Sequence, residues 1–234
     1  MNATEVMKQL EKMGSEQQRK TYERHGCPGP MFGVKIADLK TIVKKVKTDT
    51  ELAKELYRTG NTDAMYLAGL IANGHELSRK ELDEWASKST WSMISGYTVP
   101  WVAAEHPQGW EAAMKWIDSS QERITVSGWN TLGAIVSMRE DEDLDLAAVE
   151  KLLDRVVRQI KTAPDNTRYA MNSFVISVGG YVKPLTRKAL AAGEKIGKVE
   201  VDMGDTACKV PAAADYIKKM IARSNYKKRK TVKC

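Results

Sequence analysis

The spacing of apolar residues constrains this chain more than any other feature of its sequence. Over residues 34–47, and again over 145–160, apolar side chains recur every three or four positions. That spacing gathers them on one face of an α-helix. The two stripes consist of Ile36, Leu39, Val43 and Val46, and of Leu146, Val149, Leu153, Val156 and Ile160, widened by Leu152 and Val157. Sustained period-two alternation between hairpin turns, which indicates strands, is absent. The sequence therefore predicts an all-α fold.

Helix-start signals divide this pattern into short helices. Thr48, Ser78 and Ser119 each stand three residues before a glutamate, which is the spacing of a capping box. Pro184 and Pro211 suit the first turn of a helix, where a backbone N–H has no partner to lose. The predicted helices cover residues 3–24, 34–47, 49–58, 62–73, 79–88, 91–104, 107–118, 121–138, 145–160, 166–180, 184–197 and 211–223.

The connections between these helices are short, so consecutive helices are expected to form antiparallel pairs. Pairs of about 30–45 residues are typical of HEAT-like repeats, which stack into a solenoid. The first helices of successive pairs begin near Thr62, Trp91, Gln121 and Asn166. We therefore expect an α-α superhelix of HEAT-like helix pairs, with a helical bundle as the alternative. Residues 1–223 would form one repeat domain, and residues 224–234 a basic C-terminal tail.

Small residues recur along the predicted first helices of these pairs. They are Ala64, Ala68 and Gly69, then Ser95 and Gly96, then Gly128 and Gly133, then Ser173, Ser177, Gly179 and Gly180. Glycine inside a helix costs about 1 kcal/mol relative to alanine, so its repeated use needs a reason. Close packing between helices is the favoured explanation, and a surface cleared for a ligand is the alternative.

Composition and cysteine usage narrow the class of protein. Apolar residues make up 42% and charged residues 29% of the chain, which argues against global disorder. No apolar run approaches the roughly 18 residues of a membrane-spanning helix, and the first residues lack the apolar region of a signal peptide. Cys27, Cys208 and Cys234 are too few and too widely spaced for a disulfide framework. We expect a cytoplasmic protein.

Positive charge is concentrated at the C-terminus. The net charge is +7, and residues 216–234 contain eight Lys or Arg and no acid. Without those eight, the remaining 29 basic residues face 30 acidic ones, so the body of the chain is nearly neutral. The cations at the tail's centre are Lys227, Lys228, Arg229 and Lys230. Such a tail attracts phosphates by releasing their counterions, or else is simply a solvated chain end.

Motifs for cofactor chemistry are missing from the sequence. It contains neither GxxxxGK[ST] nor a GxGxxG that follows a predicted strand, so we expect no nucleotide cofactor. His25, His75 and His106 stand far apart and form no HExxH motif, so we expect no zinc site. Next to Lys209, Cys208 allows the idea of an activated thiol. A structured connection in which Asp205 and Thr206 bond the backbone is the favoured interpretation.

The aromatic residues are skewed toward tryptophan. The chain has six tryptophans and two phenylalanines. The tryptophans stand within 45 residues and are Trp85, Trp91, Trp101, Trp110, Trp116 and Trp129. Most are expected to fill the core. Tryptophan also stacks on bases and attracts cations, and a cationic, alkylated base would satisfy both tendencies.

Two short elements carry a resemblance to a known family. They are Phe32-Gly33-Val34-Lys35-Ile36-x-x-Leu39, and Lys88-Ser89-Thr90-Trp91 leading to Val99-Pro100. In order and spacing they resemble the AlkD-like DNA alkylation repair family, the HEAT-like repeat DNA glycosylases. The resemblance implies a superhelix that holds duplex DNA on its concave face. Active members excise N3- or N7-alkylated purines, using aromatic residues against the lesion and a carboxylate that stabilises the developing sugar cation.

The resemblance carries over to this chain only in part. Trp91 matches the family's tryptophan, but the catalytic aspartate four residues later is Ser95 here. The family's arginine falls near Gly128, with Arg123 as a distant substitute, and a later aromatic matches Phe174. Serine cannot supply negative charge, and losing such electrostatic stabilisation typically costs several kcal/mol, on the order of 3.

The sequence thus predicts a double-stranded DNA-binding protein of the alkylation repair family, with Trp91, Phe174, Arg123 and the tail cations at the DNA. Excision of alkylated purines is the expected activity if another acid replaces the missing aspartate. One alternative is a member that binds DNA without catalysis. The other is a HEAT-type scaffold for a protein partner, which the near-neutral body of the chain favours.

Overall fold

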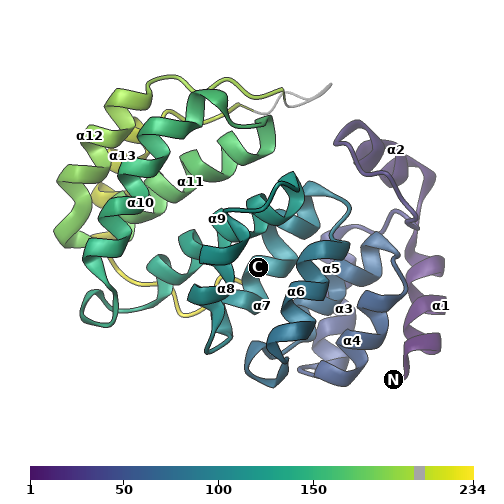
Figure 1. Ribbon diagram of the computed structural model, residues 1–234. Helices are drawn as coiled ribbons and strands as arrows, with labels where there is room; N and C mark the ends of the chain where they lie inside the picture. Colours follow the sequence, from purple (N-terminus) through teal and green to yellow (C-terminus); the bar gives the residue numbers. More distant parts are fainter. Residues whose placement is uncertain (203–208) are drawn as a thin grey trace. The chain divides into compact units, whose positions relative to one another are not determined.

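The computed structural model describes residues 1–202 and 209–234 (Figure 1). Over these residues the chain forms 13 α-helices and five short helical segments of other kinds, and no strand. The all-α prediction is confirmed. The predictions for Asp205, Thr206 and Cys208 fall outside the described residues.

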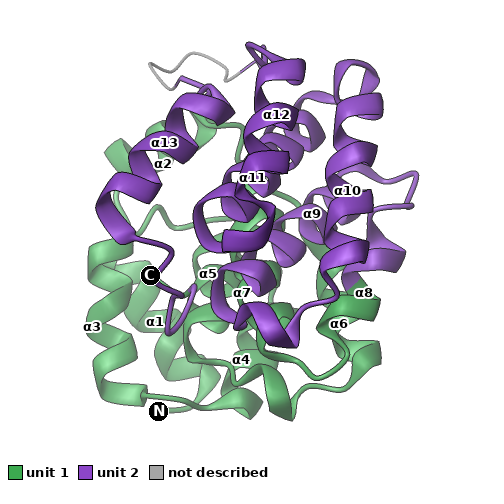
Figure 2. Cartoon of the chain, turned by 90° about the vertical axis from the view of Figure 1, so that its left-hand side faces the viewer, with its two compact units in different colours: residues 1–112, 203–207, 233–234 green, residues 113–202, 208–232 purple. Residues whose placement is uncertain are grey.

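The chain divides into two compact units (Figure 2). Among the described residues, the first unit comprises 1–112 and 233–234, and the second comprises 113–202 and 209–232. The boundary expected at residue 223, between a repeat domain and its tail, stays a prediction. Each unit is described by itself below.

The first unit is built from the helices up to residue 112. They are α1 (Ala3–Met13), α2 (Glu16–Arg24), α3 (Ile36–Val46), α4 (Thr50–Arg58), α5 (Thr62–Ile71), η1 (Gly74–Glu76), α6 (Arg79–Lys88), η2 (Ile94–Thr98) and α7 (Val99–Glu105), followed by the start of α8 (Gly109–Trp116). At its centre is α5, which packs against α1, α3, α4, η2 and α7. Every residue of α5 except Leu70 is buried, as expected for a helix that is apolar on all sides.

The second unit is arranged around α11 (Asp165–Tyr181), which packs against the other long helices of this unit. The remaining elements are α9 (Glu122–Met138), η3 (Asp141–Asp143), α10 (Leu146–Gln159), η4 (Ile160–Thr162), η5 (Lys183–Leu185), α12 (Thr186–Ile196) and α13 (Ala213–Ser224). The most extensive helix pair in the unit is α9 with α11, and its core includes the fully buried rings of Trp129 and Phe174.

Helix packing accounts for several of the glycines within the helices, as predicted. A Cβ on Gly69 of α5 would lie 2.7 Å from Thr98 Cγ2, and one on Gly179 of α11 would lie 2.5 Å from Ile217 Cδ1. On Gly128 of α9 it would lie 2.9 Å from a backbone nitrogen. Contacts this short leave no room for a side chain, so these glycines allow neighbouring elements to approach.

Most predicted helices agree with the structure to within a few residues, but the single helix expected over 3–24 is wrong. The chain breaks at Gly14, and Ser15 accepts a hydrogen bond from Gln18 N as the N-cap of α2. At Gly14 the backbone of Phe32 comes so close that a Cβ would lie 2.4 Å from its carbonyl oxygen. The Gly-Ser pair was therefore a visible break signal in the sequence.

Helix caps were predicted with mixed success. Ser78 and Glu81 form the expected capping box at the start of α6. At α4 the cap is Asp49 rather than Thr48, and α9 begins after Gln121 without a side-chain cap. Asp49 accepts from the N–H of Leu52, whereas the predicted capping box had Thr48 accepting from the N–H of Glu51.

The two prolines also had mixed outcomes. Pro184 lies in the first turn of the short segment η5, as expected. Pro211 precedes α13, so its predicted place within the first turn is wrong.

A buried carboxylate joins the loop before α3 to the start of α5. Asp63, only 3% exposed, accepts backbone N–H bonds from Phe32 (2.6 Å), Gly33 (3.0 Å) and Val34 (3.0 Å). Burial raises the pKa of Asp63, and the three N–H bonds oppose that shift. Gly33 has a φ of +80°, and a Cβ there would lie 2.6 Å from Ser15 O, so only glycine fits.

We expect Asp63→Asn to lower the free energy of unfolding by about 2–4 kcal/mol. In either orientation, the NH2 of the new amide faces a backbone N–H that now donates to the carboxylate, so at least one of these hydrogen bonds is lost. Urea denaturation of the variant beside Glu55→Gln, an exposed glutamate of α4, measures the effect. Equal stability of the two variants would contradict the role given to Asp63.

Candidate nucleic-acid interface

The segment that carries the family motif contains a π-helical turn. The helix that begins after Trp91 runs through η2 (Ile94–Thr98) into α7, and Val99 N donates to Ile94 O across the wide turn. Pro100 has no N–H to donate, and in a regular helix its ring would clash with the carbonyl four residues earlier. A π turn moves that carbonyl away, and such turns are frequent at functional sites.

Trp91 lies inside the first unit. Trp91 is only 6% exposed, and its indole Nε1 donates to His25 O at 2.8 Å. Its ring packs against Tyr22, with ring centroids 5.1 Å apart. The hydroxyl of Tyr22 donates to Val34 O at 2.8 Å, and burial raises its pKa to about 12, so it remains a donor at neutral pH. Trp91 therefore anchors α2 to the rest of the unit.

Ser95 is also buried, with 3% exposed, and its hydroxyl donates to Trp91 O at 3.3 Å. Two carboxylates of the same unit are already engaged. Asp63 accepts the three N–H bonds described above, and Glu105 accepts from Lys233 Nζ at 2.8 Å and from Gly74 N at 3.0 Å. Position 95 thus holds a neutral hydroxyl where the resemblance expects a charge.

A second aromatic group includes Tyr97 of the π turn and Trp101 of α7. Trp101 packs edge-on against the buried Tyr66, with ring centroids 5.2 Å apart. The ring of Tyr97 also packs on Trp101, with ring centroids 6.1 Å apart and an angle of 58° between the ring planes. Burial raises the pKa of the Tyr66 hydroxyl, which lies 3.3 Å from Cys234 Sγ. Tyr97 is the exception in this group because 43% of it is exposed. Sequence reasoning missed it, although its place in the motif segment was a signal.

The other predicted site residues belong to the second unit. Phe174 is fully buried and packs against Trp129, with ring centroids 5.4 Å apart. Arg123 is exposed near the start of α9 and donates to Gln121 Oε1. Gly128 packs so closely on Ile117 that the family's arginine could not occupy its place. The structure brings Trp91 and Ser95 together, whereas Phe174 and Arg123 lie in the other unit.

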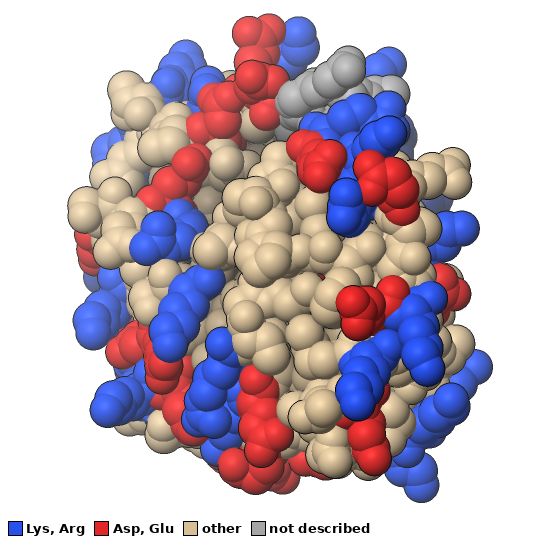
Figure 3. Space-filling view, turned by 90° about the vertical axis from the view of Figure 1, so that its right-hand side faces the viewer, with Lys and Arg blue, Asp and Glu red and all other residues tan. Residues whose placement is uncertain are grey.

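The tail is partly bound to the body of its own chain. The side chain of Lys228 is only 9% exposed, and its Nζ forms an ion pair with Asp141 Oδ1 at 2.8 Å. The same Nζ donates a hydrogen bond to Val136 O at 3.0 Å. Arg229 N donates to Ser137 O at 2.8 Å. The side chains of Lys227, Arg229 and Lys230 remain exposed. Charges elsewhere are mixed, since Lys and Arg are interspersed with Asp and Glu on the face drawn in Figure 3.

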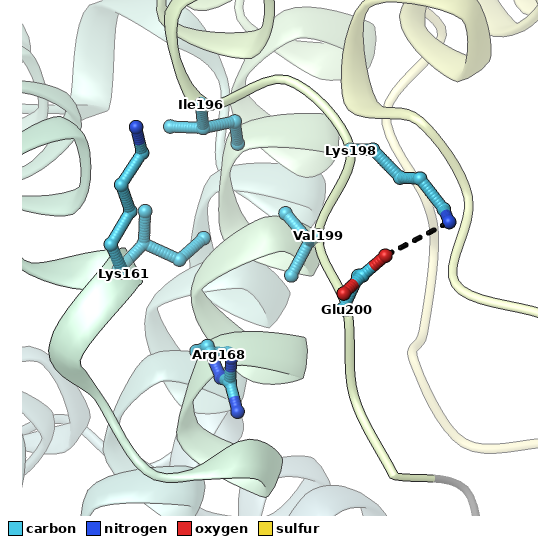
Figure 4. Close-up of a pocket in the computed structure, with 7 residues that line it drawn as sticks. Lys161, Arg168, Ile196, Lys198, Val199 and Glu200 are labelled. Carbon is cyan, nitrogen blue, oxygen red and sulfur yellow. Dashed lines mark hydrogen bonds and ion pairs between the residues drawn. The ribbon is translucent and has the colours of Figure 1, made fainter.

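A pocket of about 250 Å³ opens beside the first turns of α11 (Figure 4). It is lined by Ile160, Lys161, Arg168, Ile196, Lys198, Val199 and Glu200. Two of its three cations are already paired, Arg168 with Asp165 and Lys198 with Glu200. The pocket is therefore not prepared for an anion, and we assign it no ligand.

Neither a metal centre nor a membrane-spanning helix is found among the described residues. Within them, His, Cys, Asp and Glu side chains nowhere gather in the threes that a metal ion needs. In the same part of the chain, no helix combines the length and hydropathy that crossing a bilayer requires.

The sequence matches the family described as DNA alkylation repair enzyme over residues 6–220. The chain belongs to this family. It is 33% identical over 212 residues to the uncharacterized protein Lin0241 of Listeria innocua, covering 88% of this chain and 91% of that protein. It is also 33% identical over 206 residues to the uncharacterized protein Lmo0209 of Listeria monocytogenes, covering 86% and 88%. The family resemblance inferred from the two motifs is confirmed.

One solved structure is 34% identical and superimposes with a TM-score of 0.90 over the whole of both chains. It is described under "A new family of proteins related to the HEAT-like repeat DNA glycosylases with affinity for branched DNA structures". At this identity and coverage the predicted HEAT-like repeat fold is confirmed.

The exposure of three tail cations leads to a prediction about DNA binding. Replacing Lys227, Arg229 and Lys230 by glutamine is expected to weaken duplex binding and to flatten its salt dependence, by up to about 0.9 in the log–log slope per lost phosphate contact. Lys228→Gln should instead lower stability, by about 1–3 kcal/mol, because it leaves Asp141 without its cation. Titrations at several salt concentrations and urea denaturation separate the effects. An unchanged slope in the triple variant would remove the tail from the DNA interface.

Proposed function

We propose that this protein binds DNA, prefers branched structures to regular duplex, and does not excise alkylated bases by the carboxylate-assisted route of its family. The absence of carboxylate-assisted excision rests on one observation, the buried Ser95, whose hydroxyl donates to Trp91 O. It occupies the position where the motif expects the catalytic aspartate.

Excision develops positive charge on the sugar, and a preorganised negative group stabilises that charge. A serine hydroxyl is neutral and contributes only a dipole. Asp63 is no substitute, because both of its oxygens accept backbone N–H bonds. Without the carboxylate the rate is expected to fall by about two to three orders of magnitude.

Trp91 supports the same conclusion. Its ring is covered by Tyr22 and its N–H is held by His25 O, so little of the indole is offered to a lesion. The buried aromatic stabilises the unit, which is the core role that most tryptophans have.

Support for DNA as the partner comes from the family and from the solved relative with affinity for branched DNA. Helical repeats present extended surfaces that suit a large ligand. The exposed cations Lys227, Arg229 and Lys230 add attraction for phosphates that is independent of base sequence.

Base excision is tested by single-turnover release of methylated purines from duplex DNA. We expect release at the spontaneous rate, and an active family member with the aspartate serves as the positive control. Release well above the spontaneous rate would contradict this half of the proposal.

DNA preference is tested by fluorescence anisotropy with a labelled four-way junction and a linear duplex of equal length at one salt concentration. We expect the junction to bind at least tenfold more tightly. Equal affinities would leave a general DNA-binding protein, and absence of binding to either would favour the scaffold alternative.

A further inference from the structure

Lysines gather along one side of α3 in the first unit. Residues 35–47 contain five lysines and a single acid, Asp38. The apolar side of α3 packs against α1 and α5 and includes the buried Leu39 and Ile42. In the view of Figure 2, α3 lies at the edge of the first unit. The exposed side, which we call the lysine face, consists of Ala37, Lys40, Thr41, Lys44 and Lys45.

The lysine face has no acid of its own to neutralise it. Over residues 1–202 and 209–234, no carboxylate lies within ion-pair distance of Lys40, Lys44 or Lys45. By contrast, Lys88, an exposed lysine of α6, pairs with Glu84 one turn away. The positive charge of the lysine face is therefore directed to its surroundings, where an anionic partner can approach it.

The stability of α3 does not explain this arrangement of charges. Lys40 and Lys44 stand four positions apart in one helix, a spacing at which like charges are destabilising. Lys35 is the N-cap of α3, at the positive end of the helix dipole, and its side chain caps no N–H group. Lys44 and Lys45, in the last turn, do complement the dipole. A bound anion would offset the repulsion between Lys40 and Lys44.

The surface among these lysines is low and its start is fixed. Ala37 and Thr41 stand three or four positions from the lysines, so they are their neighbours on the helix surface. The hydroxyl of Thr41 turns back to donate to Asp38 O at 2.7 Å. The loop before α3 is held by its N–H bonds to Asp63. Small residues among long cationic side chains let an extended polyanion lie close to the helix.

We propose that the lysine face of α3 binds the phosphate backbone of DNA, as a contact separate from the cations of the tail. This inference rests on the proposed function. The lysine face belongs to the first unit, whereas Lys227, Arg229 and Lys230 belong to the second. Lysine binds phosphate as a point charge, and the counterions that it releases make such binding independent of base sequence.

DNA fits the lysine face better than a membrane does. A basic amphipathic helix that lies on an anionic membrane buries its apolar side in the lipid. In α3 that side is already packed against α1 and α5. What α3 offers to a partner is therefore charge without an apolar surface, which matches a phosphate backbone.

The test compares variants of the full chain. The first, the α3 variant, replaces Lys40, Lys44 and Lys45 by glutamine, and the second replaces them by arginine, which keeps the charge. The control variant loses the same charge from three exposed lysines on three other helices, α6, α10 and α12, by glutamine at Lys80, Lys151 and Lys195. Binding to a four-way junction and to a linear duplex of equal length is measured by fluorescence anisotropy at several salt concentrations.

For the α3 variant we expect affinity for both DNAs to fall roughly tenfold or more at low salt. The log–log salt slope should flatten by up to about 2.7, which is about 0.9 for each of three lost phosphate contacts. The arginine variant and the control variant should bind nearly like the natural chain. Thermal unfolding of the α3 variant should not shift to lower temperature, because the repulsion between Lys40 and Lys44 is removed. A merely structural role would lower the unfolding temperature and leave the salt slope unchanged.

Each failure has its own signature. If the natural chain binds neither DNA, the proposed function fails and this inference falls with it. If the natural chain binds DNA and the α3 variant keeps its affinity and salt slope, only the lysine face is overturned. An equal loss in the control variant would assign the effect to net charge rather than to α3.

Two further outcomes separate the remaining cases. If the natural chain binds junction and duplex equally, the preference for branches is refuted, and a weaker α3 variant still supports the lysine face. Vesicles of phosphatidylserine and phosphatidylcholine test the membrane. Vesicle binding that is lost in the α3 variant, with DNA affinity unchanged, would overturn the proposal and assign the lysine face to a membrane surface.

Discussion

The bond set around Asp63 is the constraint on which the first unit depends. One carboxylate holds three successive N–H groups of residues 32–34, a stretch without helix or strand to satisfy them. Buried N–H groups without acceptors are costly, so the loop and the start of α5 are joined. In this loop the carbonyl oxygen of Val34 accepts a hydrogen bond from the hydroxyl of Tyr22, and the ring of Tyr22 packs on Trp91. Through this loop the Asp63 carboxylate helps to hold Tyr22 against Trp91.

The motif that marks the family is present in this chain without the acid that the resemblance leads us to expect at position 95. Residues 88–100 retain the tryptophan and the proline, and the proline, whose ring would clash in a regular helix, directly follows the wide turn. The aspartate is replaced by a serine that bonds within its own helix. A fold can keep its framework while the site changes, because packing and catalysis make separate demands on the same residues.

Net charge is an incomplete guide to the tail of this protein. Of its cations, Lys228 pairs with Asp141 and Lys233 with Glu105, so both act within the molecule. Their acidic partners stand 87 and 128 residues away in sequence. A count of basic residues cannot distinguish such structural cations from those left for phosphates, and only the exposed side chains contribute to the second group.

The sequence by itself determined the all-α class, the family and most helix limits, including residues 79–88 of α6, because apolar periodicity and capping are local properties. At Gly14 a local break signal was present in the sequence, and the close approach of the Phe32 backbone adds a tertiary reason for the break. Tertiary structure alone decided that Trp91 is buried, that Tyr97 is partly exposed and that Lys228 pairs with Asp141. Burial depends on which distant residues meet, and no periodicity within one segment records those encounters.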